Sequence, residues 1–154
     1  MSATTTTAPA PSDAYRGMLS LERAIGKGRI ELSLRELIKQ RVSQINGCAF
    51  CIDMHWKDAR AAGETEQRLY SLPAWRECPY YSERERAGLL LAEELTRLAD
   101  KPAPEAAIER AHEHFDAQEL EDLLWVIAAI NTWNRISIGS RKTPGDYQPE
   151  GATH

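Results

Sequence analysis

The sequence predicts a single all-α domain, and three observations support this prediction. Apolar residues recur at helical spacing almost throughout the chain, and no stretch shows a convincing period of two. Glycines or prolines separate the periodic segments, as expected between helices. The 154 residues are enough for one domain that buries its own core.

Three helices are expected in the first half of the chain. They cover residues 13–26, 31–46 and 48–62. A glycine marks the end of each helix, in the stretches GKG, NGC and AGE, because glycine adopts the left-handed conformation that often closes a helix. In the second helix Leu34, Ile38 and Ile45 share one face, which we expect to be buried.

Short turns and then longer helices are expected in the second half. Helical turns are expected near residues 65–71 and around Trp75, separated by Pro73, and longer helices over residues 82–98, 104–114 and 116–139. Two of the longer helices open with a capping box, in which two side chains bond each other's backbone N–H groups. The pairs are Ser82 with Glu85 and Asp116 with Glu119.

These elements divide the chain into one domain and two tails. Residues 1–12, rich in Thr, Ala and Pro, are expected to form a disordered tail. Residues 13–139 form the helical domain, and residues 140–154 are expected to be a loose C-terminal tail. The N-terminal residues lack the basic start and apolar stretch of a secretory signal, so we expect a cytoplasmic protein with thiols in a reducing compartment.

Composition and charge exclude several classes of partner. The net charge of −4 argues against nucleic acid and against an anionic membrane surface, since both attract basic patches. No apolar run approaches the roughly 18 residues that a membrane span needs. We therefore expect neither nucleic acid nor a membrane as a partner, and no motif in the sequence requires a cofactor.

The stretch CAFCIDMH holds two of the three cysteines in the spacing C-x2-C-x3-H. If Cys48 opens a helix, Cys48, Cys51 and His55 lie on one face, and that face points inward or into a cleft. The opposite face carries charged residues that we expect to contact water. These are Asp53, Lys57, Arg60 and Glu64.

Three physical effects make the two thiols reactive in this arrangement. The free N–H groups of a helix's first turn favour a thiolate and so lower a cysteine pKa. His55 can accept the proton of Cys51 or stabilise its thiolate. Residues three apart on a helix have Cα atoms about 5–5.5 Å apart, which a disulfide tolerates, so one thiol could be oxidised by a peroxide and condense with the other.

Two other interpretations of the stretch stay open at this point. The thiols could simply pack as small apolar groups in a core helix. They could also bind a structural zinc ion with His55, in which case the fourth ligand would be Cys78, His112, His114 or a carboxylate, because the sequence has no second CxxC. We expect the redox pair and no metal, and Cys78 is expected to be a packing thiol.

The segment RELIKQRVSQINGCAFCIDMHWKDARAAGE resembles the carboxymuconolactone decarboxylase / alkylhydroperoxidase D superfamily, in its CxxC-containing branch. The family pattern joins an acidic residue to C-x2-C-x3-H, and Glu36, Cys48, Cys51 and His55 fit it. The resemblance covers about residues 15–140. It implies an AhpD-like helical domain in which a central helical hairpin carries the CxxC, assembled into a homo-oligomer, often a trimer or hexamer.

The resemblance also implies a reaction and a role for each of the four residues. The activity is reduction of an alkyl hydroperoxide, in which Cys51 attacks, Cys48 resolves, and His55 with Glu36 moves protons. The reductant is a dithiol protein, lipoyl or thioredoxin-like. The chain departs from the best-studied peroxidases at Ala49 and Phe50, since those enzymes have a histidine between the cysteines. Decarboxylase members generally lack the CxxC.

The helical phase of residues 31–46 adds two expectations. Glu36 falls opposite the apolar face, on a side that also holds Gln40 and Ser43, and this polar seam suits a helix covered on both sides that lines a cavity. Arg41 lies amid apolar residues, so it needs a carboxylate partner or a subunit interface, because an unpaired buried charge is very costly.

Four aromatic residues have two interpretations. Trp56, Trp75, Tyr80 and Tyr81 could form the wall of an apolar pocket beside the thiols, although such residues individually are more often core or interface residues. Trp125 and Trp133 are expected in the core or at an oligomer contact, and NTWNRI near the end in an interface or capping role. Two further functions remain as alternatives: a lyase that acts on a lactone or keto acid through His55 and Glu36, and a non-enzymatic zinc or redox-responsive oligomer.

Overall fold

The structure is a computed structural model that describes residues 11–100 and 104–150. These residues form helices and no strand, which confirms the all-α prediction. The helices are α1 (Asp13–Lys27), α2 (Leu32–Asn46), α3 (Ala49–Ala61), α4 (Glu66–Ser71), a 3-10 helix η1 (Leu72–Ala74), α5 (Glu83–Thr96), α6 (Glu105–His112) and α7 (Ala117–Gly139). Most of the tail expected over residues 1–12, and the last residues of the tail expected from 140, lie outside the described part of the chain.

The helix ends follow the local signals in the sequence. Both capping boxes form, Ser82 with Glu85 and Asp116 with Glu119. Gly47 closes α2 with a left-handed φ of 69°, a conformation that costs glycine little. Pro73 differs from the expectation, because it lies inside η1 instead of separating two turns. A proline has no N–H to donate, so the first turn of a short helix accommodates it.

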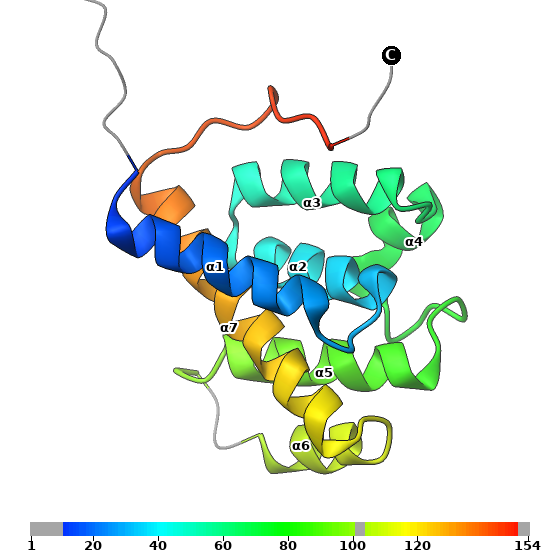
Figure 1. The fold of residues 1–154 in the computed structure, drawn as a ribbon. Coiled ribbons are helices and arrows are strands. Elements are labelled where there is room, and N and C mark those ends of the chain that lie inside the picture. Colours follow the sequence, from blue (N-terminus) through cyan, green and yellow to red (C-terminus); the bar gives the residue numbers. More distant parts are fainter. Residues whose placement is uncertain (1–10, 101–103, 151–154) are drawn as a thin grey trace, which may run out of the picture.

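Helix α2 is the central element of the molecule. It packs against α3, α5 and α7, and α1 lies across the front of the group in Figure 1. Every residue from Glu36 to Ser43 is buried. The helix is therefore covered on both sides, as the polar seam predicted, and its polar side chains need partners inside the protein.

Arg41 finds its partner on α5. Its Nε donates to Oε1 of Glu93 over 2.6 Å, and the indole of Trp75 and the guanidinium of Arg76 donate to the same carboxylate. Burial raises the pKa of Glu93, but these three hydrogen bonds outweigh it and hold the pKa below its ordinary value. The charged pair thus joins α2 to α5 with its hydrogen bonds satisfied.

Helix α7 is the longest helix and has two different faces. One face packs into the core against α1, α2, α3, α5 and α6. The other exposes large apolar side chains, namely Leu124, Trp125, Ile136 and Ile138. Among the described residues, no helix combines the length and apolar character required to cross a membrane.

Candidate active site

The two cysteines of the motif form a disulfide at the start of α3. Cys48 is the residue that caps the helix, and its sulfur accepts the backbone N–H of Cys51 over 3.3 Å. Their Cα atoms lie 5.3 Å apart, as the helical spacing predicted. Both side chains are buried. The short connection through Gly47 places the pair directly beside the end of α2.

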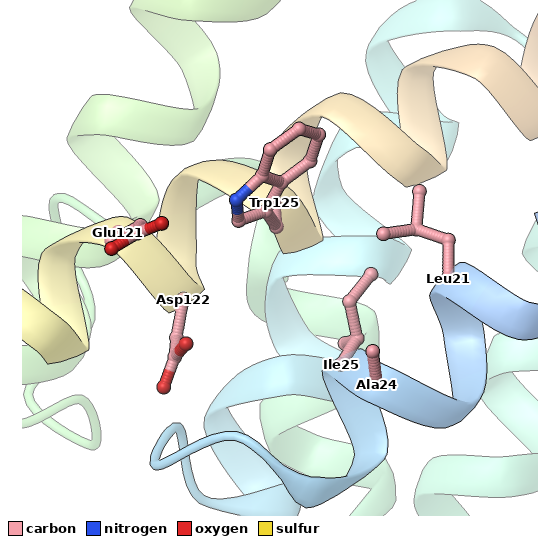
Figure 2. A pocket seen from close by; sticks show the side chains of 6 residues that line it. All are labelled: Leu21, Ala24, Ile25, Glu121, Asp122 and Trp125. Atoms are coloured by element: carbon pink, nitrogen blue, oxygen red, sulfur yellow. The ribbon is translucent and has the colours of Figure 1, made fainter.

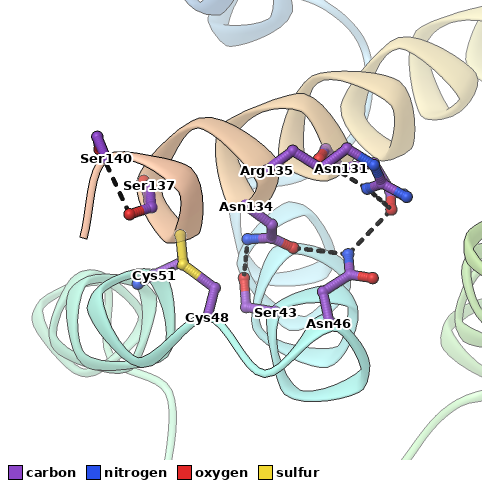
Figure 3. The surroundings of a disulfide bond; sticks show 9 residues. All are labelled: Ser43, Asn46, Cys48, Cys51, Asn131, Asn134, Arg135, Ser137 and Ser140. Carbon is purple, nitrogen blue, oxygen red and sulfur yellow. Dashed lines mark hydrogen bonds between the residues drawn. A yellow bond between two sulfur atoms is a disulfide. The ribbon is translucent and has the colours of Figure 1, made fainter. Parts of the chain in front are cut away.

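A network of amide side chains holds this connection in place (Figure 3). The side-chain N–H2 of Asn46 donates to Asn131 over 3.0 Å and to Asn134 over 2.9 Å, and Asn134 donates to Ser43 over 3.0 Å. The residues of NTWNRI that we expected at an interface or cap therefore bind the end of α2 to α7. Because Asn46 lies two residues before Cys48, the network fixes where α3 begins.

His55 and Glu36 meet between α3 and α2. Nδ1 of His55 lies 2.8 Å from Oε2 of Glu36, and both side chains are buried. Burial raises the pKa of Glu36, but the hydrogen bond and charge of His55, together with Lys39 and Arg35, outweigh it and lower the pKa. The carboxylate thus stays ionised and fixes the ring, which leaves the other ring nitrogen for chemistry.

A pocket of 440 Å³ brings three of the four predicted residues together. Cys51, His55 and Glu36 line it, and α1, α7 and the chain after α7 complete its walls. Cys48 lines an adjoining hollow of 330 Å³ beside Arg141 and Lys142, and the two cavities share Phe50, Ser137 and Lys142 in their walls. The two cysteines of the disulfide therefore line neighbouring cavities.

The aromatic residues of the pocket are not those that we expected. Tyr15, Phe50, Trp133 and Tyr147 line it, whereas Trp56, Trp75, Tyr80 and Tyr81 do not, so that prediction is wrong. Trp75 instead lies in the core against Glu93. Tyr15 and Trp133 come from α1 and α7 and make an edge-to-face contact at 5.6 Å, a pairing that the local sequence does not encode.

Residues 140–150, expected as a loose tail, follow an ordered path over α3 (Figure 1). We call them the strap. The Nζ of Lys57 donates to the carbonyl groups of Gly145 and Tyr147, and the carboxylate of Asp53 accepts the N–H of Gly145. Two of the four charged residues that were expected to face water, Asp53 and Lys57, thus hold the strap.

The strap brings one further residue pair to the pocket that the sequence analysis missed. The hydroxyl of Tyr147 donates to Oδ1 of Asp58 over 2.7 Å, and both residues line the pocket. Asp58 could have been found, because it lies seven residues after Cys51 and so shares its helix face. No signal in the sequence places Tyr147 there.

One group of three residues in the described chain has the spacing of metal ligands. It consists of Glu36, His55 and Asp58, whose ligand atoms lie within 4.8 Å of one another. Cys48 and Cys51 are bonded to each other, and no such group within the described ranges includes Cys78, His112 or His114. Glu36 and His55 bind each other, and Asp58 binds Tyr147.

A smaller pocket of 230 Å³ lies between α1 and α7, away from the thiols (Figure 2). Leu21, Ala24 and Ile25 form one wall, and Glu121, Asp122 and Trp125 form the other. It holds no cysteine or histidine, and Asp122 accepts the backbone N–H of Arg29. The site residues that the sequence singled out therefore lie at the 440 Å³ pocket and at the hollow that adjoins it.

Comparisons with known proteins agree with this architecture. The model of the Carboxymuconolactone decarboxylase family matches residues 12–94. The uncharacterized protein YdfG of Bacillus subtilis is 51% identical over 121 residues, which are 79% of this chain and 82% of YdfG.

Solved structures share the fold. The protein of unknown function ATU0492 from Agrobacterium tumefaciens, a candidate antioxidant defence protein AhpD, is 40% identical with a TM-score of 0.83, over 88% of this chain and 92% of that one. The debrominase Bmp8 is 16% identical with a TM-score of 0.79, and the match covers 87% of this chain and 72% of the Bmp8 chain. This second likeness concerns the fold alone.

Proposed function

Because the chain belongs to the carboxymuconolactone decarboxylase family and has a dithiol beside a buried His–Glu pair, we propose that it is a thiol-dependent hydroperoxide reductase of the alkylhydroperoxidase D type. The observation that carries the proposal is the position of Cys51, which lines the same pocket as His55 and Glu36. A nucleophilic thiol, a base and a group that orients the base are the parts that thiol catalysis needs.

In the proposed reaction the reduced Cys51 gives its proton to His55, and the resulting thiolate attacks the distal oxygen of the hydroperoxide. A sulfur–oxygen bond forms, the O–O bond breaks, and the departing alkoxide takes up a proton to leave as an alcohol. Cys48 then attacks Cys51, the sulfur–oxygen bond breaks, and hydroxide leaves as water with the proton of Cys48. Two thiols are oxidised to the disulfide and one hydroperoxide is reduced.

A dithiol protein completes the cycle by reducing the disulfide. The hollow lined by Cys48 adjoins the hydroperoxide pocket and gives this partner an approach to the disulfide. Arg141 and Lys142 line the hollow and favour an acidic partner surface, consistent with a lipoyl or thioredoxin-like reductant. Such reductants work in the cytoplasm, which is where we place the cycle.

Hydroperoxide consumption in the presence of a dithiol reductant tests the proposal. Wild-type protein should consume hydroperoxide and lose two thiols per chain on stoichiometric oxidation, as Cys48 and Cys51 join. Replacing Cys51 by Ser should abolish turnover, and replacing Cys78 by Ser should preserve it, because Cys78 lies outside both cavities. Wild-type rates after Cys51→Ser would contradict the proposal.

A second candidate function is a lyase or related acid–base enzyme that acts on a small lactone or keto acid. It is favoured by the set of Glu36, His55 and Asp58, which needs no sulfur to move a proton. The debrominase Bmp8 shows that this fold accommodates a different reaction. Enzymatic activity that survives replacement of both Cys48 and Cys51 would identify the lyase. Metal analysis that finds one zinc ion per chain, with thiols of Cys48 and Cys51 that cannot be titrated, would identify a zinc module.

We also propose that the chain assembles into a homo-oligomer, a trimer or hexamer, through the outer face of α7. Leu124, Trp125, Ile136 and Ile138 expose large apolar surfaces on this one helix. Large apolar side chains exposed along one helix face typically mark contacts between proteins. Burial of the same face in each copy would give a symmetric assembly.

A further inference from the structure

Asp58 lies among the groups that would move protons in the proposed reaction. It follows Cys51 by seven residues and His55 by three, so all three side chains project from one face of α3. Carboxylate oxygens of Asp58 and Glu36 and a ring nitrogen of His55 lie within 4.8 Å of one another. Asp58 also lines the pocket that contains Cys51.

Asp58 differs from its two neighbours in its access to solvent. Glu36 and His55 are buried, whereas Asp58 is only partly buried. Asp58 and Glu36 also line a second hollow of 650 Å³, which is bounded by the strap and by the end of α3 and contains neither cysteine. Asp58 therefore lies where the dithiol pocket adjoins a second cavity.

The two carboxyl groups have opposite environments. Burial raises the pKa of Asp58 and the charge of Glu36 raises it further, against the opposing effects of Tyr147, His55 and Lys39. The pKa of Glu36 is lowered. Adjacent carboxyl groups with pKa values pushed apart divide the roles of base and acid between them. Glu36 is suited to remain ionised beside His55, and Asp58 is suited to hold a proton.

We propose that Asp58 stores the proton of Cys51 and returns it to the alkoxide, and that Tyr147 is its positioning residue; this inference rests on the proposed function. The thiol proton passes through His55 to the Asp58 carboxylate and leaves the Cys51 thiolate. The thiolate forms the sulfur–oxygen bond as the O–O bond breaks. The alkoxide takes the proton from Asp58, so an alcohol leaves and the carboxylate is regenerated.

The strap fixes the position of Tyr147 relative to Asp58. Lys57 donates to the carbonyl group of Tyr147 itself, and Asp53 binds Gly145 two residues earlier. The charged and titratable groups that face Asp58 are Glu36 and Lys39 from α2, His55 from α3, and Tyr147 and Glu150 from the strap. Of these, Tyr147 is the one that donates a hydrogen bond to Asp58 among the described residues.

The pH profile of hydroperoxide reduction tests both roles. Asp58→Asn cannot store a proton, so its rate should fall about 10²-fold at pH values where the Cys51–Asp58 pair of the wild type holds one proton, and should approach the wild-type rate at high pH, where that pair has lost it. Tyr147→Phe removes a hydrogen bond that favours the ionised carboxylate. The pKa of Asp58 should rise, and the alkaline fall in rate should move to higher pH.

Tyr70→Phe is the matched control for Tyr147→Phe, because Tyr70 is 69% exposed on α4 and does not line the dithiol pocket. It should keep the wild-type pH profile. A wild-type profile in both Asp58→Asn and Tyr147→Phe would overturn the inference, as would an equal change in Tyr70→Phe. Tyr147→Phe keeps the test valid if Asp58→Asn does not fold. A wild-type protein without activity towards any hydroperoxide would instead overturn the proposed function.

Discussion

The imidazole of His55 on α3 lies 2.8 Å from the carboxylate of Glu36 on α2, and the protein buries both. The two residues are nineteen positions apart in the sequence. This contact joins the two helices of the hairpin directly beside the dithiol. It determines which ring nitrogen of His55 remains for the substrate, because the other one is held by the carboxylate.

Replacement of Glu36 by Gln should lower kcat/KM for a hydroperoxide by about 10²-fold, since an amide does not stabilise a positively charged ring as a carboxylate does. Steady-state kinetics with a dithiol reductant measure the change. Glu31→Gln is the matched control, because Glu31 caps the same helix and binds Arg84 instead. Equal rates for Glu36→Gln and wild type would remove Glu36 from the mechanism.

Replacement of Glu93 by Gln should reduce the free energy of unfolding by about 3–5 kcal/mol, because it leaves the buried Arg41 without its counter-charge. Urea unfolding followed by circular dichroism measures this loss. Glu113→Gln, in an exposed ion pair with Arg110, should change the stability far less. Similar losses in the two variants would contradict the importance of the buried pair.

The contribution of Glu93 to the free energy of unfolding should also depend on pH, and the direction of this dependence is defined. Its pKa is lowered in the folded protein, so its ionised form stabilises the fold above the unfolded-state value of about 4.3. The stability difference between wild type and Glu93→Gln should be constant at neutral pH and shrink as the pH falls below that value towards the folded pKa. A difference that grows on acidification would reverse this assignment.

Replacement of Trp125 by Glu should convert an oligomer into smaller species, because it places a charge in the apolar face of α7. Trp125 is 51% exposed in the single chain. Light scattering coupled to size exclusion measures the molar mass of each form. Tyr70→Glu is the control, since Tyr70 is 69% exposed but lies on α4. An unchanged oligomer in Trp125→Glu would exclude this face as the interface.

The fold followed from the sequence because its signals are local. Capping boxes such as Ser82 with Glu85, and the glycine after α2, set helix ends through contacts within a few residues. The placement of Cys48, Cys51 and His55 on one side of α3 follows from helical geometry in the same way. Cys51 and His55 therefore share a pocket as the periodicity suggested.

The partners of buried polar groups did not follow from periodicity. Arg41 clearly needed a counter-charge, yet the choice of Glu93, fifty-two residues away, depends on how α2 packs on α5. The pocket wall was mispredicted for the same reason. Tyr15 and Trp133 meet only because α1 and α7 cross, whereas Trp75 and Tyr81 are drawn into the core.

The sequence by itself determined the helices, the inward face of α3 and the pairing distance of the two thiols, because each depends on residues within one or two turns. The tertiary structure alone decided that Cys48 and Cys51 line two neighbouring cavities and that Tyr147 reaches Asp58. These contacts join segments as much as 89 residues apart. They arise from the packing of whole elements, which the spacing within any one element does not encode.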